Sequence, residues 1–164
     1  MLSLDRIHII GGPGSGKSYL AAALSERLEC PHTDLDTLYW NSDFSQKTEA
    51  GDRRLQLDRV VAADQWIIEG AYCGAWLNPS FEASDIIIKL ETNPLLQKAR
   101  LARRLGGRIM RGETNLHQSL NLLRWVDGFE SSLDNLSSVY NSKLTPIIGK
   151  TGVSAYLADL QNIT

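Results

Sequence analysis

The chain has 164 residues, of which 43% are hydrophobic and 22% are charged, and its formal net charge is −2. This length and composition predict one globular domain over residues 1–164, and no apolar run approaches the roughly 20 residues of a membrane-spanning helix. The nearly balanced charge argues against nucleic acid or an anionic membrane as a partner.

The first predicted elements are a strand and a helix that are separated by a loop. Residues 6–10 form a short apolar run that is typical of a buried parallel strand. No apolar leader precedes this run, so we expect no signal peptide. Leucines at every fourth position predict a helix from about residue 17 to about residue 30.

The intervening loop reads Gly-Gly-Pro-Gly-Ser-Gly-Lys-Ser and matches the phosphate-binding pattern G-x-x-x-x-G-K-[ST] at every fixed position. Its glycines let successive backbone N–H groups face one concavity, with no Cβ in the way of a phosphate. Lys17 offers a positive charge to the β- and γ-phosphates, and the Ser18 hydroxyl is a hard ligand for Mg²⁺. A plain glycine-rich turn is the alternative, which the flanking strand and helix disfavour. The motif therefore predicts binding of ATP and Mg²⁺ through Gly11, Gly12, Gly14, Ser15, Gly16, Lys17, Ser18 and Tyr19.

Two acids, Asp34 and Asp36, stand where a short second strand at residues 32–36 should end. Because they are two residues apart, an extended segment would point both side chains to the same side. In doubly wound sheets, ligands bind beyond the carboxyl ends of the strands. We therefore expect the two carboxylates to hold Mg²⁺ through water and to orient an acceptor. The alternative is a helix N-cap followed by a solvated turn.

Residues 37–63 are predicted to form an acceptor-binding insertion that includes a helix beginning near residue 52. Tyr39, Trp40 and Phe44 are aromatic residues in a polar stretch, and they either make a small satellite core or line an acceptor pocket. Arg53 lies on the predicted helix. It becomes a binder of the acceptor if the acceptor carries a phosphate.

A third strand is predicted at residues 66–70, where Trp-Ile-Ile-Glu-Gly ends in an acid and a glycine. Glu69 could position Mg²⁺ or its water shell, and Gly70 could permit close approach of the acceptor. A simple exit from strand to loop is the alternative. Asn-Pro-Ser at residues 78–80 is predicted to break the chain before a fourth strand at residues 84–90.

The helix after the fourth strand carries six basic residues and no acidic one between residues 98 and 111. Phosphoryl transfer leaves negative charge on phosphate oxygens, which arginine donors stabilise. This segment therefore predicts an arginine-rich lid over about residues 100–128, although a solvated basic face is the usual meaning of a charge run. Arg100 and Arg104 are four residues apart and are therefore neighbours on one helix face.

The rest of the chain completes an alternating pattern of helices and strands. Residues 115–140 are helical by period, residues 144–148 predict a fifth strand at the sheet edge, and a turn at residues 149–152 precedes a final helix. Cys30 and Cys73 lack metal-ligand spacing, so we expect reduced thiols in a cytoplasmic protein.

These elements together resemble the nucleoside monophosphate kinase group of P-loop proteins. A closer resemblance is to the bacterial adenylate-kinase-related proteins known as DNA topology modulation proteins. It spans most of the chain and rests on residues 11–18, 35–40, 66–72 and 85–90. The resemblance implies an α/β fold with three layers, in which helices flank a five-stranded parallel sheet of order 2-3-1-4-5. It also implies a closing lid and an adenine site at residues 149–152. In such a lid Arg100, Arg104 and Arg108 serve lid and phosphate contacts, with Arg100 on the nucleotide.

Two classes of function remain open. The favoured one is a Mg²⁺-dependent, ATP-dependent kinase that phosphorylates a nucleotide or another small-molecule acceptor. After the third strand the chain differs from the Asp-Gly-Phe-Pro segment of adenylate kinases, so the acceptor stays open, as does the choice between a monomer and a homodimer. The alternative is an ATP-binding regulatory or DNA-associated protein without a small-molecule acceptor. In the kinase hypothesis Lys17, Asp36, Arg104 and Arg108 are catalytic, and the acceptor contacts Asp34, Asp36, Tyr39, Arg53, Glu69 and Gly70.

Overall fold

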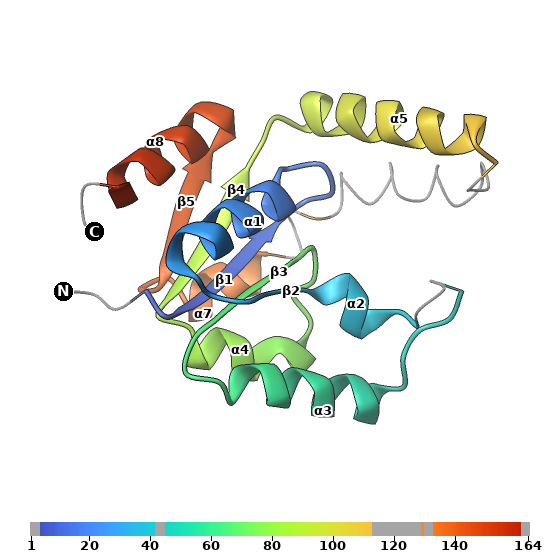
Figure 1. The fold of residues 1–164 in the computed structure, drawn as a ribbon. Helices are drawn as coiled ribbons and strands as arrows, with labels where there is room; N and C mark the ends of the chain where they lie inside the picture. The colour runs from blue at the N-terminus through green and yellow to red at the C-terminus, as the bar shows by residue number, and fades with distance from the viewer. Residues whose placement is uncertain (1–3, 42–44, 113–128, 130–132, 162–164) are drawn as a thin grey trace.

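The computed structural model describes residues 4–41, 45–112, 129 and 133–161, and it has a sheet between two layers of helices (Figure 1). Five strands pair in parallel in the order β2-β3-β1-β4-β5, as predicted. The edge position predicted for the last strand is therefore confirmed. The strands are β1 (Arg6–Gly11), β2 (His32–Asp34), β3 (Trp66–Gly70), β4 (Ile86–Glu91) and β5 (Leu144–Ile148).

Helices cover both faces of the sheet because every crossover between parallel strands passes over one face or the other. One face is covered by α1 (Lys17–Leu28) and α8 (Gly149–Gln161). The other face is covered by α2 (Leu35–Tyr39), α3 (Ala50–Val61), α4 (Asn78–Ala83) and α7 (Asp134–Val139). A short 3₁₀ helix, η1 (Ala75–Leu77), precedes α4, and the long helix α5 (Pro94–Met110) follows β4.

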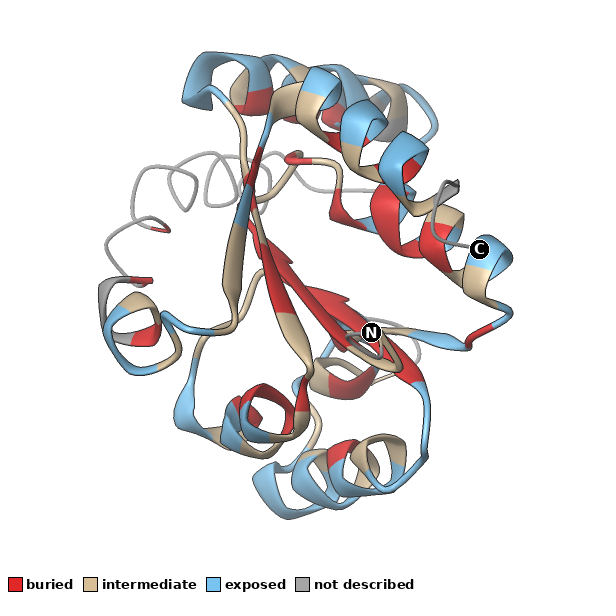
Figure 2. Ribbon diagram, turned by 90° about the vertical axis from the view of Figure 1, so that its left-hand side faces the viewer, coloured by how far each residue is buried: buried red, intermediate tan, exposed pale blue. Residues whose placement is uncertain are grey.

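The central strand β1 supplies side chains to both cores. Ile7 and Ile9 pack with α1 and α8, whereas Ile10 packs with the helices on the opposite face. This alternation follows from the two-residue period of a strand, and burial on both faces explains the continuous apolar run. Figure 2 shows the buried strands lying between helices whose outer surfaces are exposed.

Three local expectations were wrong. Residues 32–36 do not form one extended segment, because β2 ends at Asp34 and α2 begins at Leu35. Pro79 does not break the chain, since it lies in the first turn of α4, where its missing N–H costs nothing. Residues 149–152 are not a turn but the start of α8. The helix predicted at residues 115–140 lies mostly outside the described residues.

None of the described helices combines the length and the apolar character needed to cross a bilayer. Neither cysteine forms a disulfide within the described ranges; Cys30 is buried and Cys73 is partly buried.

Candidate active site

The phosphate-binding loop joins β1 to α1 and holds two residues in the left-handed region. Gly14 has φ 77° and Gly16 has φ 106°, which are conformations that side chains rarely allow. Gly16 is the N-cap of α1 and offers no side-chain hydrogen bond, so the first N–H groups of α1 have no partner within the helix. An open helix N-terminus beside a glycine-rich loop suits an anion such as a phosphate.

Other predicted nucleotide contacts lie around the same loop. Gly11 closes β1, and Gly12 and Ser15 follow it in the loop. The Ser15 hydroxyl is buried and has no hydrogen-bond partner in the described part of the chain, so it retains a donor for a ligand. Tyr19 lies in the first turn of α1, and its side chain is largely exposed.

Lys17 is a buried cation at the centre of this arrangement. Its Nζ donates a hydrogen bond to the Gly12 carbonyl oxygen at 3.1 Å. Burial lowers the pKa of Lys17, while the three nearby carboxylates of Glu69, Asp36 and Asp34 raise it. A buried ammonium among carboxylates is what an anion-binding lysine requires, because the acids keep it charged before a phosphate arrives.

The three carboxylates come from neighbouring elements at the carboxyl edge of the sheet. Asp34 ends β2 and pairs in register with Glu69 of β3, while Asp36 lies in the first turn of α2. The Asp34 side chain caps that helix, because its Oδ1 accepts a hydrogen bond from the backbone N–H of Asp36 at 2.9 Å. The expectation that an extended segment aligns the two aspartates was therefore wrong, although both lie near Lys17.

Oxygen donors suited to Mg²⁺ lie beside the loop. The Ser18 hydroxyl hydrogen-bonds the Glu69 side chain, and burial raises the pKa of Glu69 and of Asp34. No group of three or more His, Cys, Asp or Glu side chains in the described ranges is placed to hold a metal alone. Mg²⁺ commonly takes one or two protein oxygens together with waters and substrate phosphates, so this donor set fits a nucleotide-borne Mg²⁺.

The first turns of α5 attach to the phosphate-binding loop. Arg100 Nη1 donates to the Gly14 carbonyl oxygen at 3.1 Å, and Thr92 Oγ1 donates to the Ser15 carbonyl oxygen at 3.2 Å. Gln97, which is almost fully buried, donates from Nε2 to the Thr92 carbonyl oxygen at 2.7 Å. Arg100 therefore contacts the backbone of the loop, and a contact with phosphate stays a prediction.

The remaining lid arginines are only partly covered by the structure. Arg104 is exposed, and its positive charge lowers the pKa of Lys17, which places it within electrostatic reach of the site. Arg108 belongs to α5, but its side chain and residues 113–128 lie outside the described residues. The lid thus stays a prediction.

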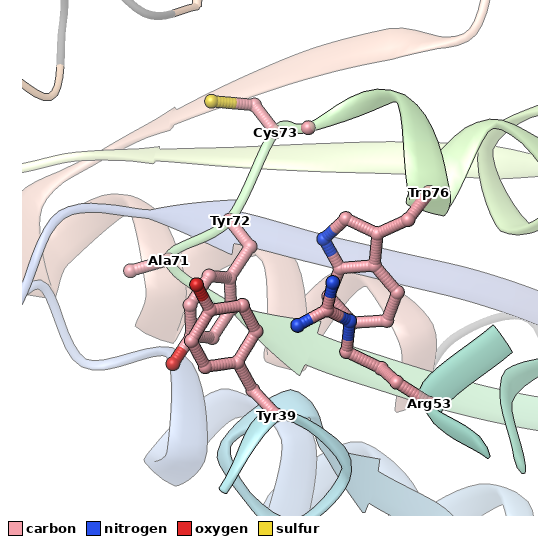
Figure 3. A pocket seen from close by; sticks show the side chains of 7 residues that line it. Tyr39, Arg53, Ala71, Tyr72, Cys73 and Trp76 are labelled. Carbon is pink, nitrogen blue, oxygen red and sulfur yellow. The ribbon is translucent and has the colours of Figure 1, made fainter. Parts of the chain in front are cut away.

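A pocket of about 320 Å³ is lined in part by Tyr72, whose hydroxyl contacts Asp36. Its wall includes Tyr39 from the end of α2 and Arg53 from α3, two of the predicted acceptor contacts. The Tyr39 ring stacks on Tyr72 with centroids 4.6 Å apart, and the Arg53 guanidinium lies close to both the Tyr39 ring and the Trp76 ring (Figure 3). The aromatic cluster was predicted either to form a small satellite core or to line an acceptor pocket, and these contacts favour the pocket. Phe44 lies outside the described residues.

Tyr72 connects this pocket to Asp36. Its hydroxyl donates to Asp36 Oδ1 at 2.5 Å and accepts from Trp40 Nε1 at 3.2 Å. Because Trp40 fills the acceptor role of the hydroxyl, the Tyr72 proton is directed at the carboxylate. Burial, followed by the hydrogen bond to Asp36, raises the pKa of Tyr72, which keeps it protonated as a donor.

Sequence reasoning missed three residues of this region: Tyr72, Trp76 and Gln97. A signal for Tyr72 was present, because it directly follows β3 and therefore lies at the same edge as Glu69. Gly70 was among the predicted acceptor contacts because a glycine permits close approach of the acceptor. A Cβ at Gly70 would lie 2.8 Å from the Leu35 side chain, so packing of α2 explains the glycine, and an acceptor contact stays a prediction.

No family model matches the chain. The uncharacterized protein YqaC of Bacillus subtilis (strain 168) is 33% identical over 131 residues, which cover 77% of this chain and 73% of YqaC. The chain belongs to the YqaC family.

Several solved structures that are similar to this YqaC-family chain are kinases. Shikimate kinase from Bacteroides thetaiotaomicron has a TM-score of 0.59 and 18% identity, covering 96% of this chain and 97% of that enzyme. A gluconokinase from Sinorhizobium meliloti 1021 has a TM-score of 0.56 and 13% identity, covering 98% of each chain. A sugar kinase from Janibacter sp. HTCC2649 has a TM-score of 0.60 and 13% identity, covering 97% and 95%. These likenesses confirm the predicted fold, a five-stranded parallel sheet flanked by helices. The narrower resemblance to DNA topology modulation proteins stays a prediction.

Proposed function

We propose that the chain is an ATP-dependent phosphotransferase that acts on a small-molecule acceptor. One observation carries the proposal: the buried Lys17 of a phosphate-binding loop lies among three carboxylates, beside a pocket that reaches one of them through Tyr72. Nucleotide-binding modules need the loop, but they do not need a second pocket at a carboxylate. A transferase needs both.

The phosphate-binding loop binds the nucleotide in this reaction. Its backbone N–H groups and the N-terminus of α1 bind the phosphates of ATP, and Lys17 balances charge on the β- and γ-phosphates. Ser18 and Asp34 would hold Mg²⁺, the latter through water, and Mg²⁺ when bound neutralises phosphate charge. Arg104 and Arg108 stabilise the charge that develops on the transferred phosphoryl group.

Asp36 and the aromatic pocket bind and orient the acceptor. Tyr72 occupies Oδ1 of Asp36, which leaves Oδ2 for an acceptor hydroxyl. If the acceptor is an alcohol, Asp36 takes its proton as oxygen attacks the γ-phosphorus. If the acceptor is a phosphate, no base is needed and Asp36 only orients it. The similar structures are kinases for shikimate, gluconate and sugars, which supports an alcohol.

The experiment is ADP release from ATP and Mg²⁺ across a panel of hydroxy acids, sugars, nucleosides and nucleotides, each compared with no acceptor. A jump with one compound names the substrate. Turnover that no compound changes would contradict the proposal and favour a regulatory ATPase, for which DNA binding is the next assay.

Lys17→Ala tests the assignment of the loop. We expect this variant to lose ATP turnover by at least about 100-fold, because no other described side chain replaces the buried ammonium. Circular dichroism should match the parent chain. A folded variant that retains turnover would refute the role of Lys17.

A further inference from the structure

The guanidinium of Arg53 lies close to two aromatic rings. Its central carbon lies 4.6 Å from the centroid of the Tyr39 ring and 4.8 Å from that of the Trp76 ring. Cation–π contacts of this kind hold the planar group against the rings without using its N–H donors. Figure 3 shows Arg53 beside Tyr39 and Trp76 at the wall of the pocket.

The charge of Arg53 has no acidic partner. In the ranges that the structure describes, Arg53 forms no ion pair, whereas the adjacent Arg54 pairs with Asp58 at 2.9 Å. The Nε atom of Arg53 is buried and has no hydrogen-bond partner there. A buried donor without a partner is costly, so it indicates a group that a ligand completes.

The surroundings of Arg53 are positive and aromatic. Lys47 Nζ lies 5.4 Å from the centroid of the Tyr39 ring, so a second cation approaches the same cluster. The lining carries no carboxylate; it consists of Tyr39, Arg53, Ala71, Tyr72, Cys73, Gly74 and Trp76. Rings offer a flat apolar wall, and the unpaired cation selects negative charge.

We propose that this pocket takes a small organic anion, whose carboxylate or phosphate group is held edge-on by Arg53 and whose flat face packs on the aromatic rings. The inference rests on the proposed function, because it names the class of acceptor whose hydroxyl reaches Asp36. Tyr72 connects the pocket that contains Arg53 to Asp36, because its ring lines the pocket while its hydroxyl contacts Asp36. One acceptor can therefore contact Arg53 with its anionic group and Asp36 with its hydroxyl. A neutral polyol or nucleoside would leave Arg53 unpaired.

The test uses binding of small probes and does not depend on catalysis. Benzoate, phenyl phosphate and benzamide share a flat ring and differ in charge, and ligand-observed NMR gives their affinities. We expect at least one of the two anions to bind about tenfold more tightly than benzamide, because a bidentate charge-assisted pair replaces a neutral contact. Whichever anion binds more tightly distinguishes a carboxylate acceptor from a phosphate acceptor.

Variants of the adjacent residues Arg53 and Arg54 test which arginine causes the preference for an anionic probe. Arg53→Gln should remove the preference for the anion, and Arg53→Lys should restore only part of it, because an ammonium lacks the planar fork. Arg54→Gln is the matched control on the same helix and should bind the probes like the parent chain, since Arg54 pairs with Asp58 on the exposed surface.

Equal affinity for benzamide and for both anions in the parent chain would overturn the inference, even if Arg53→Gln were poorly folded. A preference that survives in folded Arg53→Gln would overturn it as well. Failure of the proposed function has a different signature, which is anion binding without acceptor-dependent ADP release. A neutral acceptor that is phosphorylated efficiently would keep the proposed function and reject the anionic class.

Discussion

At the residue scale, the hydrogen bond between Tyr72 and Asp36 is the contact that joins the two halves of the candidate site. Asp36 lies on α2 and Tyr72 follows β3, so the 2.5 Å contact ties two elements of the carboxyl edge together. Trp40 donates to the same hydroxyl and fixes its direction. The carboxylate therefore has one preferred orientation, which a transfer reaction needs.

Tyr72→Phe should slow phosphoryl transfer while leaving substrate binding largely intact. The ring remains to line the pocket, but the Asp36 carboxylate loses the donor that orients it, so we expect kcat to fall about 10- to 100-fold. The KM values for ATP and acceptor should change far less. Steady-state kinetics with the acceptor identified by the panel provides the measurement.

The control for this variant is Tyr156→Phe on α8. Its buried hydroxyl has no hydrogen-bond partner among the described residues, so its removal should leave kcat unchanged. If Tyr72→Phe raised the acceptor KM at constant kcat, Tyr72 would be only a wall of the pocket. The orientation of Asp36 would then need another cause.

At the element scale, α5 is attached to the phosphate-binding loop through its first turns and not only through its arginine-rich surface. Arg100 and Thr92 donate to loop carbonyl groups, and Gln97 donates to Thr92. A glycine-rich loop with two residues at positive φ gains from such contacts, because glycine has the most backbone freedom to lose. The attachment keeps the loop ready for phosphate.

Arg100→Ala should weaken ATP and ADP binding by the same factor, about 3- to 10-fold, because the Arg100 hydrogen bond holds the loop and not the γ-phosphate. Titration of both nucleotides gives the comparison. Arg59→Ala, an exposed arginine of α3, controls for the loss of one positive charge. A loss confined to ATP would instead make Arg100 a ligand of the γ-phosphate.

The elements that sequence could predict are those with a strong local signal. Apolar runs predicted the strands, and the phosphate-binding motif predicted the turn into α1, because both depend on neighbouring residues alone. The start of α2 was missed, since Asp34 reads equally well as the end of a strand and as a helix cap. Pro79 was misread for the same reason, because proline both stops helices and begins them.

At the scale of the whole molecule, the topology brings the site together from segments far apart in the chain. Asp34 of β2 lies beside Glu69 of β3, and the loop after β1 starts at the same edge, because β3 pairs with β2 on one side and with β1 on the other. The carboxyl-edge rule predicted the region and its acids. It could not predict the contacts of Arg53 with two rings or the bond between Tyr72 and Asp36, because these depend on how loops pack on each other.

The sheet also encloses an ionisable side chain at its centre. His8 of β1 is fully buried, its two ring nitrogens have no hydrogen-bond partner within the described part of the chain, and its ring packs 4.4 Å from Phe81. Burial lowers the pKa of His8 from 6.5 to about 3. The folded protein therefore keeps His8 neutral over a range in which the unfolded chain protonates it.

This difference makes the stability of the whole fold depend on pH. Between pH 6.5 and about 3 the unfolded state binds more protons at His8, so the free energy of unfolding rises with pH in that window and levels off above it. The His8 contribution at about pH 5 is therefore roughly 2 kcal/mol smaller than at about pH 7.5. Asp34 and Glu69, whose pKa values burial raises, act in the opposite direction.

His8→Leu isolates the histidine from these acids. Leucine suits an apolar site beside Phe81 and removes two buried nitrogens without partners, so we expect stability at about pH 7.5 to be equal or higher. Urea unfolding at both pH values should give a variant that gains about 2 kcal/mol on the parent chain as the pH falls. The acids are common to both chains and cancel in this difference. Parallel stability curves would mean that His8 is protonated or solvated inside the sheet, which its burial between β3 and β4 argues against.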